Sequence, residues 1–63
     1  MSNLKALREQ AGLTQSDAAK MVFRSRDTWA AYESGKIVPD EAICTLFQIL
    51  VDPIIESRRK AGL

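Results

Sequence analysis

The sequence predicts an all-α fold of five short helices in a single domain of residues 1–63. Apolar residues recur at the spacing of an amphipathic helix along most of the chain. Residues that favour helix starts precede these runs, and Gly12 and Gly35 follow two of them, as expected at helix ends. No segment has the pattern of a strand, and no repeat or Gly/Ser-rich linker divides the chain.

The first three helices are predicted by apolar spacing and by capping residues. Leu4 and Leu7 begin an apolar face that ends before Gly12. Thr14 can accept a hydrogen bond from the backbone of the next turn, so a second helix is expected to follow it. Ser25 can do the same for a third helix that runs to about residue 34.

The C-terminal third predicts two further helices. Asp40 is a candidate cap for a fourth helix that ends near Leu50. Asp52 is a candidate cap for a fifth helix with Pro53 in its first turn, where a proline is well tolerated. A break between two helices is therefore expected near residue 51.

Composition excludes several classes of protein. The chain has 63 residues, 46% of them apolar and 27% charged, as expected for one globular domain with a small core. No apolar run could span a bilayer and the first residues do not form a signal peptide, so a cytoplasmic location is expected. With no histidine, a lone Cys44 and no phosphate loop, we expect no enzyme, no metal site and no cofactor.

Residues 14–35 have the pattern of a helix-turn-helix. Ala18 and Ala19 would let two crossing helices approach closely, and Trp29 would anchor the inner face of the second helix. The start of that helix is polar and could face a DNA groove. Net charge is only +1, but residues 20–36 carry four basic and two acidic groups, which makes this region locally basic.

The segments "LREQAGLTQ", "SRDTW" and "YESGK", in this order and spacing, resemble the phage Cro and repressor type (XRE-like) helix-turn-helix domain. The later "ICTLFQIL" is similar to small phage and mobile-element regulators, including anti-CRISPR-associated autorepressors. The resemblance implies a lambda-repressor-like fold and a homodimeric repressor that binds an inverted-repeat operator in double-stranded DNA through the helix starting at Ser25. We expect no small-molecule ligand.

The resemblance also implies roles for individual residues. The positions from which family members reach base edges are occupied by Arg26, Asp27 and Ala31. The positions expected to contact the DNA backbone are occupied by Gln15, Arg24, Ser25, Thr28, Ser34 and Lys36. An arginine of the first helix, Arg8, is expected to pair with Glu33 at the end of the third.

Each of these roles has an alternative. Arg26 could be a solvated surface arginine, and Asp27 could serve only to complement the helix dipole. Ala31 could read a thymine methyl group or simply permit close approach to DNA. Arg8 and Glu33 could form an exposed pair, which would contribute little to stability.

The turn departs from the family pattern at two positions. Phe23 stands where such domains usually have a glycine, and Arg24 stands where they usually have a buried apolar residue. Because a bulky residue at positive φ is strained, the second helix is expected to end differently. Phe23 would then be buried and Arg24 would face outward.

In the C-terminal segment, residues 40–63, apolar residues would cover more of the helix surface than a single core can bury. We therefore expect a twofold dimer interface there, formed by Cys44, Phe47, Leu50, Val51, Ile54 and Ile55. The alternative is that the fifth helix folds back and closes the core of a monomer. The rival function is a protein-interaction module, such as an antitoxin whose apolar C-terminal surface binds a partner protein.

Overall fold

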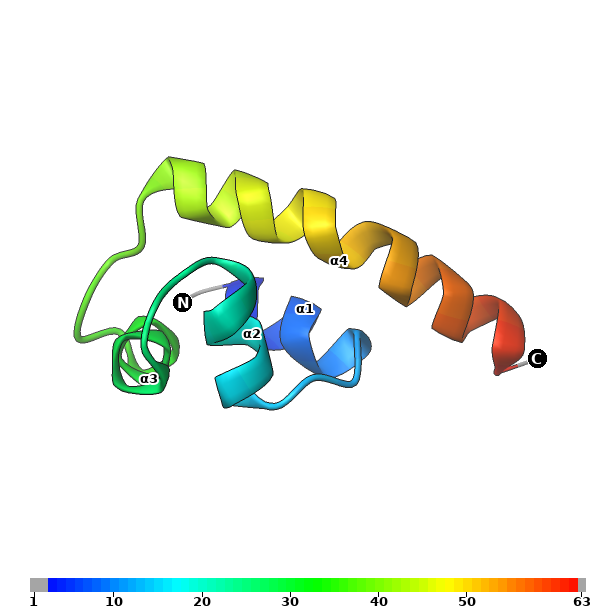
Figure 1. The fold of residues 1–63 in the computed structure, drawn as a ribbon, viewed down its shortest axis with the longest axis horizontal. Coiled ribbons are helices and arrows are strands. Elements are labelled where there is room, and N and C mark those ends of the chain that lie inside the picture. The colour runs from blue at the N-terminus through cyan, green and yellow to red at the C-terminus, as the bar shows by residue number, and fades with distance from the viewer. Residues whose placement is uncertain (1–2, 63) are drawn as a thin grey trace.

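A computed structural model describes residues 3–62 of the chain and contains four helices in this range: α1 (Asn3–Gln10), α2 (Gln15–Met21), α3 (Arg26–Ser34) and α4 (Glu41–Ala61). The helices α1, α2 and α3 lie on one side of α4, which runs the length of the molecule (Figure 1). No strand occurs in residues 3–62. The all-α prediction is therefore confirmed, whereas the predicted count of five helices is wrong.

The expected fourth and fifth helices are one continuous helix, α4, with Pro53 inside it. Asp52 does not cap a new helix; its Oδ1 accepts a hydrogen bond of 2.6 Å from Gln48 Nε2 one turn earlier. An interior proline costs a helix about 3 kcal/mol because it lacks an N–H and crowds the preceding turn. The apolar stripe continues across Pro53 from Val51 to Ile54, so burial on both sides of the proline favours a single helix.

The turns after α1, α2 and α3 share one backbone geometry. A residue one or two positions beyond each helix has a left-handed backbone, at Gly12 (φ 71°), Phe23 (φ 59°) and Gly35 (φ 85°). The following N–H group then bonds back to the last helical turn; after α2, the N–H of Arg24 donates to the carbonyl of Ala19 at 2.9 Å. At Phe23 this conformation costs about 1–2 kcal/mol, because a Cβ is present.

The expectation that Phe23 would be buried is therefore wrong. Its side chain is 83% exposed, and Val22, only 1% exposed, fills the core at this turn instead. The chain keeps the glycine-like backbone at residue 23, which directs the phenyl ring away from the core. Arg24 is exposed, as expected.

One core joins all four helices. Trp29 of α3 lies at its centre, with its ring centroid 4.7 Å from that of Phe47 in α4 and 6.2 Å from that of Tyr32. The buried residues of this core are Leu4, Ala11, Ala18, Ala19, Val22, Trp29, Tyr32, Ile43, Phe47 and Val51. The core fixes α3 against the rest of the molecule.

In the described range, no helix combines the length and apolar character required to cross a membrane.

Candidate nucleic-acid interface

The helices α2 and α3 and the turn between them form a helix-turn-helix unit. The fully buried Ala18 and Ala19 allow the two helices to pack closely. Both helix starts are capped as the sequence predicts: Thr14 Oγ1 accepts from the N–H of Asp17 at 3.1 Å, and Ser25 Oγ accepts from the N–H of Thr28 at 3.2 Å. Local capping and close packing thus define where α3 begins and how it is held.

The helix α3 has one buried face and one exposed face. Trp29 and Tyr32 are buried in the core, whereas Arg26 and Asp27 are exposed at the N-terminal end of the helix. Ala31 is half-buried and lies one turn after Asp27, on the outward side. The three residues predicted to reach base edges therefore lie on the side of α3 that points away from the core or at its edge.

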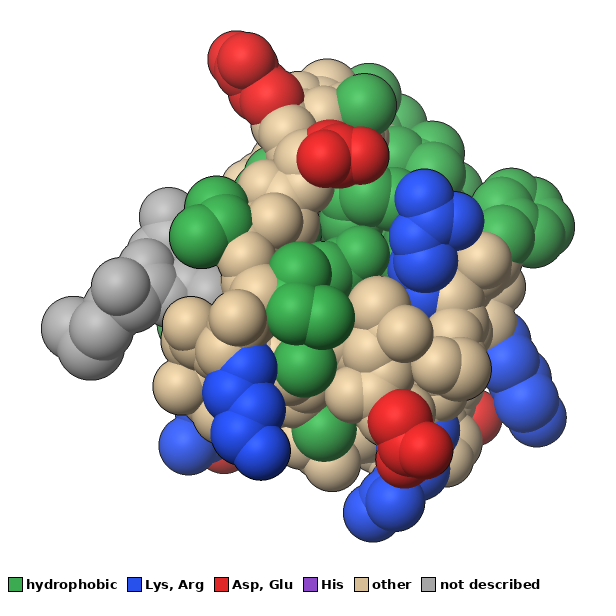
Figure 2. All heavy atoms as spheres, turned by 90° about the vertical axis from the view of Figure 1, so that its left-hand side faces the viewer, with side chains coloured by type: hydrophobic (Ala, Val, Ile, Leu, Met, Phe, Trp, Pro, Cys, Tyr) green, Lys and Arg blue, Asp and Glu red, His purple; other side chains and the backbone are tan. Residues whose placement is uncertain are grey.

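The molecular end that carries α3 is seen in Figure 2. Lys and Arg side chains are spread over the lower half, the right edge and the upper right of this face, and apolar side chains lie between them (Figure 2). Acidic side chains lie at the top and near the lower edge. The face is mixed in charge, so its basic groups are individual protrusions and do not form a continuous patch.

The side chains predicted to contact the DNA backbone differ in how many of their hydrogen-bond donors are already used within the chain. Arg24 and Lys36 are exposed, and one Arg24 nitrogen donates to the carbonyl of Phe23 at 3.2 Å. The hydroxyl groups of Ser25 and Thr28 lie 2.9 Å apart and share one hydrogen bond, which leaves one of their two protons to donate elsewhere. The hydroxyl of Ser34 donates to a backbone carbonyl of its own helix, at 3.2 Å.

Gln15 lies at the start of α2 and is half-buried. Its Nε2 donates to Glu33 Oε1 at 3.0 Å. A glutamine amide carries two N–H bonds, so one remains for an acceptor such as a phosphate oxygen. The bond to Glu33 would hold that second N–H in a fixed direction.

Glu33 is the centre of a hydrogen-bond network that links three helices. Arg8 Nε of α1 donates to Glu33 Oε2 at 2.7 Å, and a second Arg8 nitrogen lies 3.3 Å from Oε1. Trp29 Nε1 donates to Oε2 from one turn earlier in α3. Arg8 also donates to the carbonyl of Leu13, at 2.9 Å, which fixes the turn before α2. The pair is part-buried, with 15% of the Arg8 side chain and 7% of the Glu33 side chain exposed.

Burial and hydrogen bonding act in opposite directions on the pKa of Glu33. Burial raises this pKa because it disfavours the charged form, whereas hydrogen bonds from Arg8, Gln15 and Trp29 and the charge of Arg8 lower it. The net pKa lies below the ordinary value. Glu33 is therefore held as a carboxylate where α1, α2 and α3 meet.

Sequence reasoning missed two of these bonds. Trp29 and Glu33 are four residues apart on a helix, so their contact could have been found from spacing alone. The contact between Gln15 and Glu33 joins two helices, and no local signal indicates it.

The residues predicted to form a dimer interface do not form one exposed surface. Phe47 and Val51 are fully buried in the core of the single chain and are not accessible to a second copy in this conformation. The other four, Cys44, Leu50, Ile54 and Ile55, are partly buried against that core. The wide apolar face of α4 is thus used mainly within the chain, because α1, α2 and α3 all lie under this one helix.

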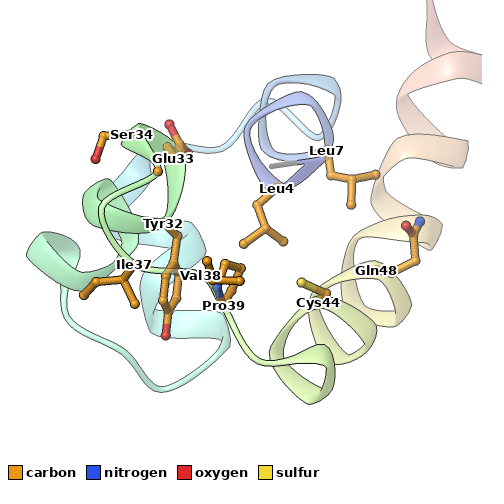
Figure 3. Close-up of a pocket in the computed structure, with 11 residues that line it drawn as sticks. Leu4, Leu7, Tyr32, Glu33, Ser34, Ile37, Val38, Pro39, Cys44 and Gln48 are labelled. Carbon is orange, nitrogen blue, oxygen red and sulfur yellow. The ribbon is translucent and has the colours of Figure 1, made fainter. Parts of the chain in front are cut away.

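A groove lies between α1, the loop before α4 and the start of α4 (Figure 3). Its volume is about 490 Å³, and Leu4, Leu7, Tyr32, Cys44 and loop residues line it. Ile37 and Val38, both exposed, lie on the loop side of this groove. Within residues 3–62, no group of three or more His, Cys, Asp or Glu side chains is placed to hold a metal ion.

A comparison with protein-family models matches residues 2–50 to a family described as a helix-turn-helix domain. No curated protein and no solved structure is similar enough to match the chain. Domains of this family bind DNA and are not catalytic, in agreement with the expectation that the chain is not an enzyme.

Proposed function

Because the chain belongs to the helix-turn-helix domain family, we propose that it represses transcription as a homodimer bound to an inverted-repeat operator. We assign it to the phage Cro and repressor type, with a phage or mobile-element promoter as its target. The helix α3, preceded by its cap Ser25, would enter the major groove. Bound there, the protein would exclude RNA polymerase from the promoter.

The observation that carries this proposal is the two-sided character of α3. Its inner face is anchored by Trp29 and Tyr32, and its N-terminal end presents Arg26 and Asp27 to solvent. In helix-turn-helix proteins, the residues at this end of the second helix contact base edges. The planar fork of Arg26 suits the O6 and N7 acceptors of guanine, and Asp27 could accept from a cytosine N4 group.

Phosphate contacts would fix the position of α3 on the duplex. Arg24 and Lys36 are exposed at the two ends of α3, and the free N–H of Gln15 lies at the start of α2. Such contacts set register and orientation without reading sequence. The network around Glu33 would keep Gln15 and α3 in a constant relative geometry.

Dimerisation is the second part of the proposal. A chain of 63 residues has a marginal core and would gain stability from a partner subunit. Partly buried apolar residues on α4, Cys44, Leu50, Ile54 and Ile55, would contribute to the interface. Two recognition helices would then lie about 34–36 Å apart, one turn of DNA, so the operator would be an inverted repeat.

The test is selection of bound sequences from a random pool of double-stranded DNA at two salt concentrations. It compares wild-type protein with Arg26→Ala and with the matched control Arg59→Ala. Arg59 is exposed near the C-terminal end of α4, at the opposite end of the molecule from α3, and its loss changes net charge equally (Figure 1). We expect an enriched inverted repeat. Arg26→Ala should lose the base preference at one position of this repeat, and Arg59→Ala should keep the preference at every position.

Two results would contradict the proposal. Weak, salt-sensitive binding with no enriched sequence would show only nonspecific attraction to phosphates. An enriched single half-site, with a monomeric mass in solution, would contradict the homodimer and leave DNA recognition standing.

The second candidate function is a protein-interaction module, such as an antitoxin. The groove beside Ile37 and Val38 favours it, because exposed apolar residues along a hollow are typical of a docking site. The test is co-expression with the product of a neighbouring gene. A stable complex that is lost in Val38→Asp, with DNA selection unchanged in that variant, would support this function.

A further inference from the structure

Phe23 occupies a backbone position that favours glycine. The equivalent positions after α1 and α3 are occupied by Gly12 and Gly35, and all three residues have positive φ. A phenylalanine is strained in this conformation, whereas a glycine is not. The geometry of the turn therefore does not explain the choice of phenylalanine.

The core does not explain it either. The side chain of Phe23 is 83% exposed, and the apolar space at the turn is filled by Val22. Among the described residues, the aromatic rings that contact one another are those of Trp29, Tyr32 and Phe47, in edge-to-face and tilted arrangements. Strain that neither the turn nor the core requires is typical of a functional site.

Phe23 lies at the entrance to α3. It opens a run of five exposed residues, 23–27, that contains two arginines, the cap of α3 and one acid, Asp27, so the run has a net positive charge. The guanidinium of Arg24 donates a hydrogen bond to the carbonyl of Phe23, which places a cation beside the backbone of Phe23. A surface that combines two cations with an exposed ring suits a partner that has anionic and apolar groups side by side.

We propose that the ring of Phe23 contacts DNA, packing against a thymine methyl group and the adjacent deoxyribose at the edge of the half-site. Double-stranded DNA presents phosphates, sugar C–H groups and thymine methyl groups within a few ångströms of one another, and phenylalanine is among the side chains that contact the methyl group. The inference rests on the proposed DNA-binding function. It adds a specificity-determining residue in the turn to those on α3.

The experiment uses the duplex enriched by the wild-type protein and replaces each thymine in turn with uracil, which lacks the methyl group. Binding is measured for wild-type protein, Phe23→Gly, Phe23→Leu and the control Ile49→Ala. Ile49 is an exposed apolar residue on the outer side of α4. Melting temperature is measured for all four proteins.

Replacement of one particular thymine with uracil should weaken binding by the wild-type protein and leave binding by Phe23→Gly unchanged. We expect its replacement to weaken wild-type binding about threefold to fivefold, the effect of one buried methyl group. Phe23→Gly should bind the unmodified duplex about threefold to tenfold more weakly and melt at a temperature no lower than the wild type. Phe23→Leu should retain most of the methyl effect, and Ile49→Ala should bind as the wild type does.

Equal affinity of Phe23→Gly and wild-type protein, with identical responses to uracil at every position, would overturn the inference alone. A wild-type protein that enriches no sequence would overturn the proposed function and this inference together. The two failures are therefore distinguishable.

Discussion

Arg8 and Glu33, 25 residues apart in the sequence, form a part-buried ion pair with 2.7 Å between Arg8 Nε and Glu33 Oε2. The pair joins α1 to the end of α3, and Gln15 and Trp29 donate to the same carboxylate. One carboxylate thus connects α1, α2 and α3. We infer that this network sets the direction in which α3 presents Arg26 to a ligand.

Removal of either charge should destabilise the protein strongly. We expect Arg8→Ala and Glu33→Ala each to lower the free energy of unfolding by about 3–5 kcal/mol, because each leaves a buried charge without its partner. Urea unfolding monitored by the fluorescence of Trp29, the single tryptophan, measures the loss. The double variant should lose less than the sum of the two. Lys5→Ala, on the exposed side of α1, is the control. If Arg8→Ala lowers the free energy of unfolding by less than about 1 kcal/mol, the pair contributes no more than an exposed surface ion pair, which would contradict the prediction.

Stability should fall in acid partly through Glu33. Its pKa in the folded protein lies below the ordinary value of 4.5, so the folded state favours the carboxylate. The resulting stabilisation is present above the unfolded pKa and is lost as the pH falls through the lower folded pKa. We expect the free energy of unfolding of Glu33→Gln to depend less steeply on pH over this interval. Glu56→Gln, an exposed position on α4, is the matched control; equal slopes for Glu33→Gln and wild-type protein would contradict the network.

Replacement of Pro53 should stabilise α4. Pro53 is exposed and lies inside the helix, so Pro53→Ala restores a hydrogen bond and removes a steric conflict without loss of burial. We expect a gain of up to about 3 kcal/mol, measured by thermal unfolding, with slower amide exchange around residue 53. Pro39→Ala, in the loop before α4, should instead lower the free energy of unfolding by about 0.4–1 kcal/mol, because the unfolded chain gains conformational entropy when the proline is removed. A loss of stability in Pro53→Ala would show that the proline is favourable where it stands.

The two left-handed glycines should differ in their response to alanine. A Cβ at Gly35 would meet nothing within 4 Å, so Gly35→Ala should cost about 1–2 kcal/mol from backbone strain alone. A Cβ at Gly12 would lie 2.5 Å from the guanidinium of Arg58, whose Nε donates to the carbonyl of Gln10 at 3.0 Å. Because the Arg58 side chain is exposed and flexible, it can move away at little cost, so Gly12→Ala should cost at most about 0.5 kcal/mol more than Gly35→Ala, through loss of that exposed hydrogen bond.

The role of Arg58 can be separated from strain by repeating the comparison in an Arg58→Ala background. There, the free energies of unfolding of Gly12→Ala and Gly35→Ala should fall by similar amounts. A difference that persists without Arg58 would show that its side chain is not the cause.

The starts and ends of the helices were largely determined by the sequence. Thr14 and Ser25 cap α2 and α3 through bonds to residues three positions away, and Gly12 and Gly35 end α1 and α3 through their own backbone freedom. These are interactions between near neighbours, so the order of residues is enough to predict them. The helix-turn-helix pattern, and with it the family, follows from the same local signals.

Packing between distant segments decided the rest. Phe47 and Val51 are core residues and Phe23 is an exposed one because α4 lies over α1, α2 and α3 and Val22 takes the space at the turn. One helix runs through Pro53 because burial on both sides of it favours a continuous stripe. The bond between Gln15 and Glu33 exists only once α2 and α3 have docked. Local order sets where helices form, whereas competition for a shared core sets which faces they bury and which they leave to a ligand.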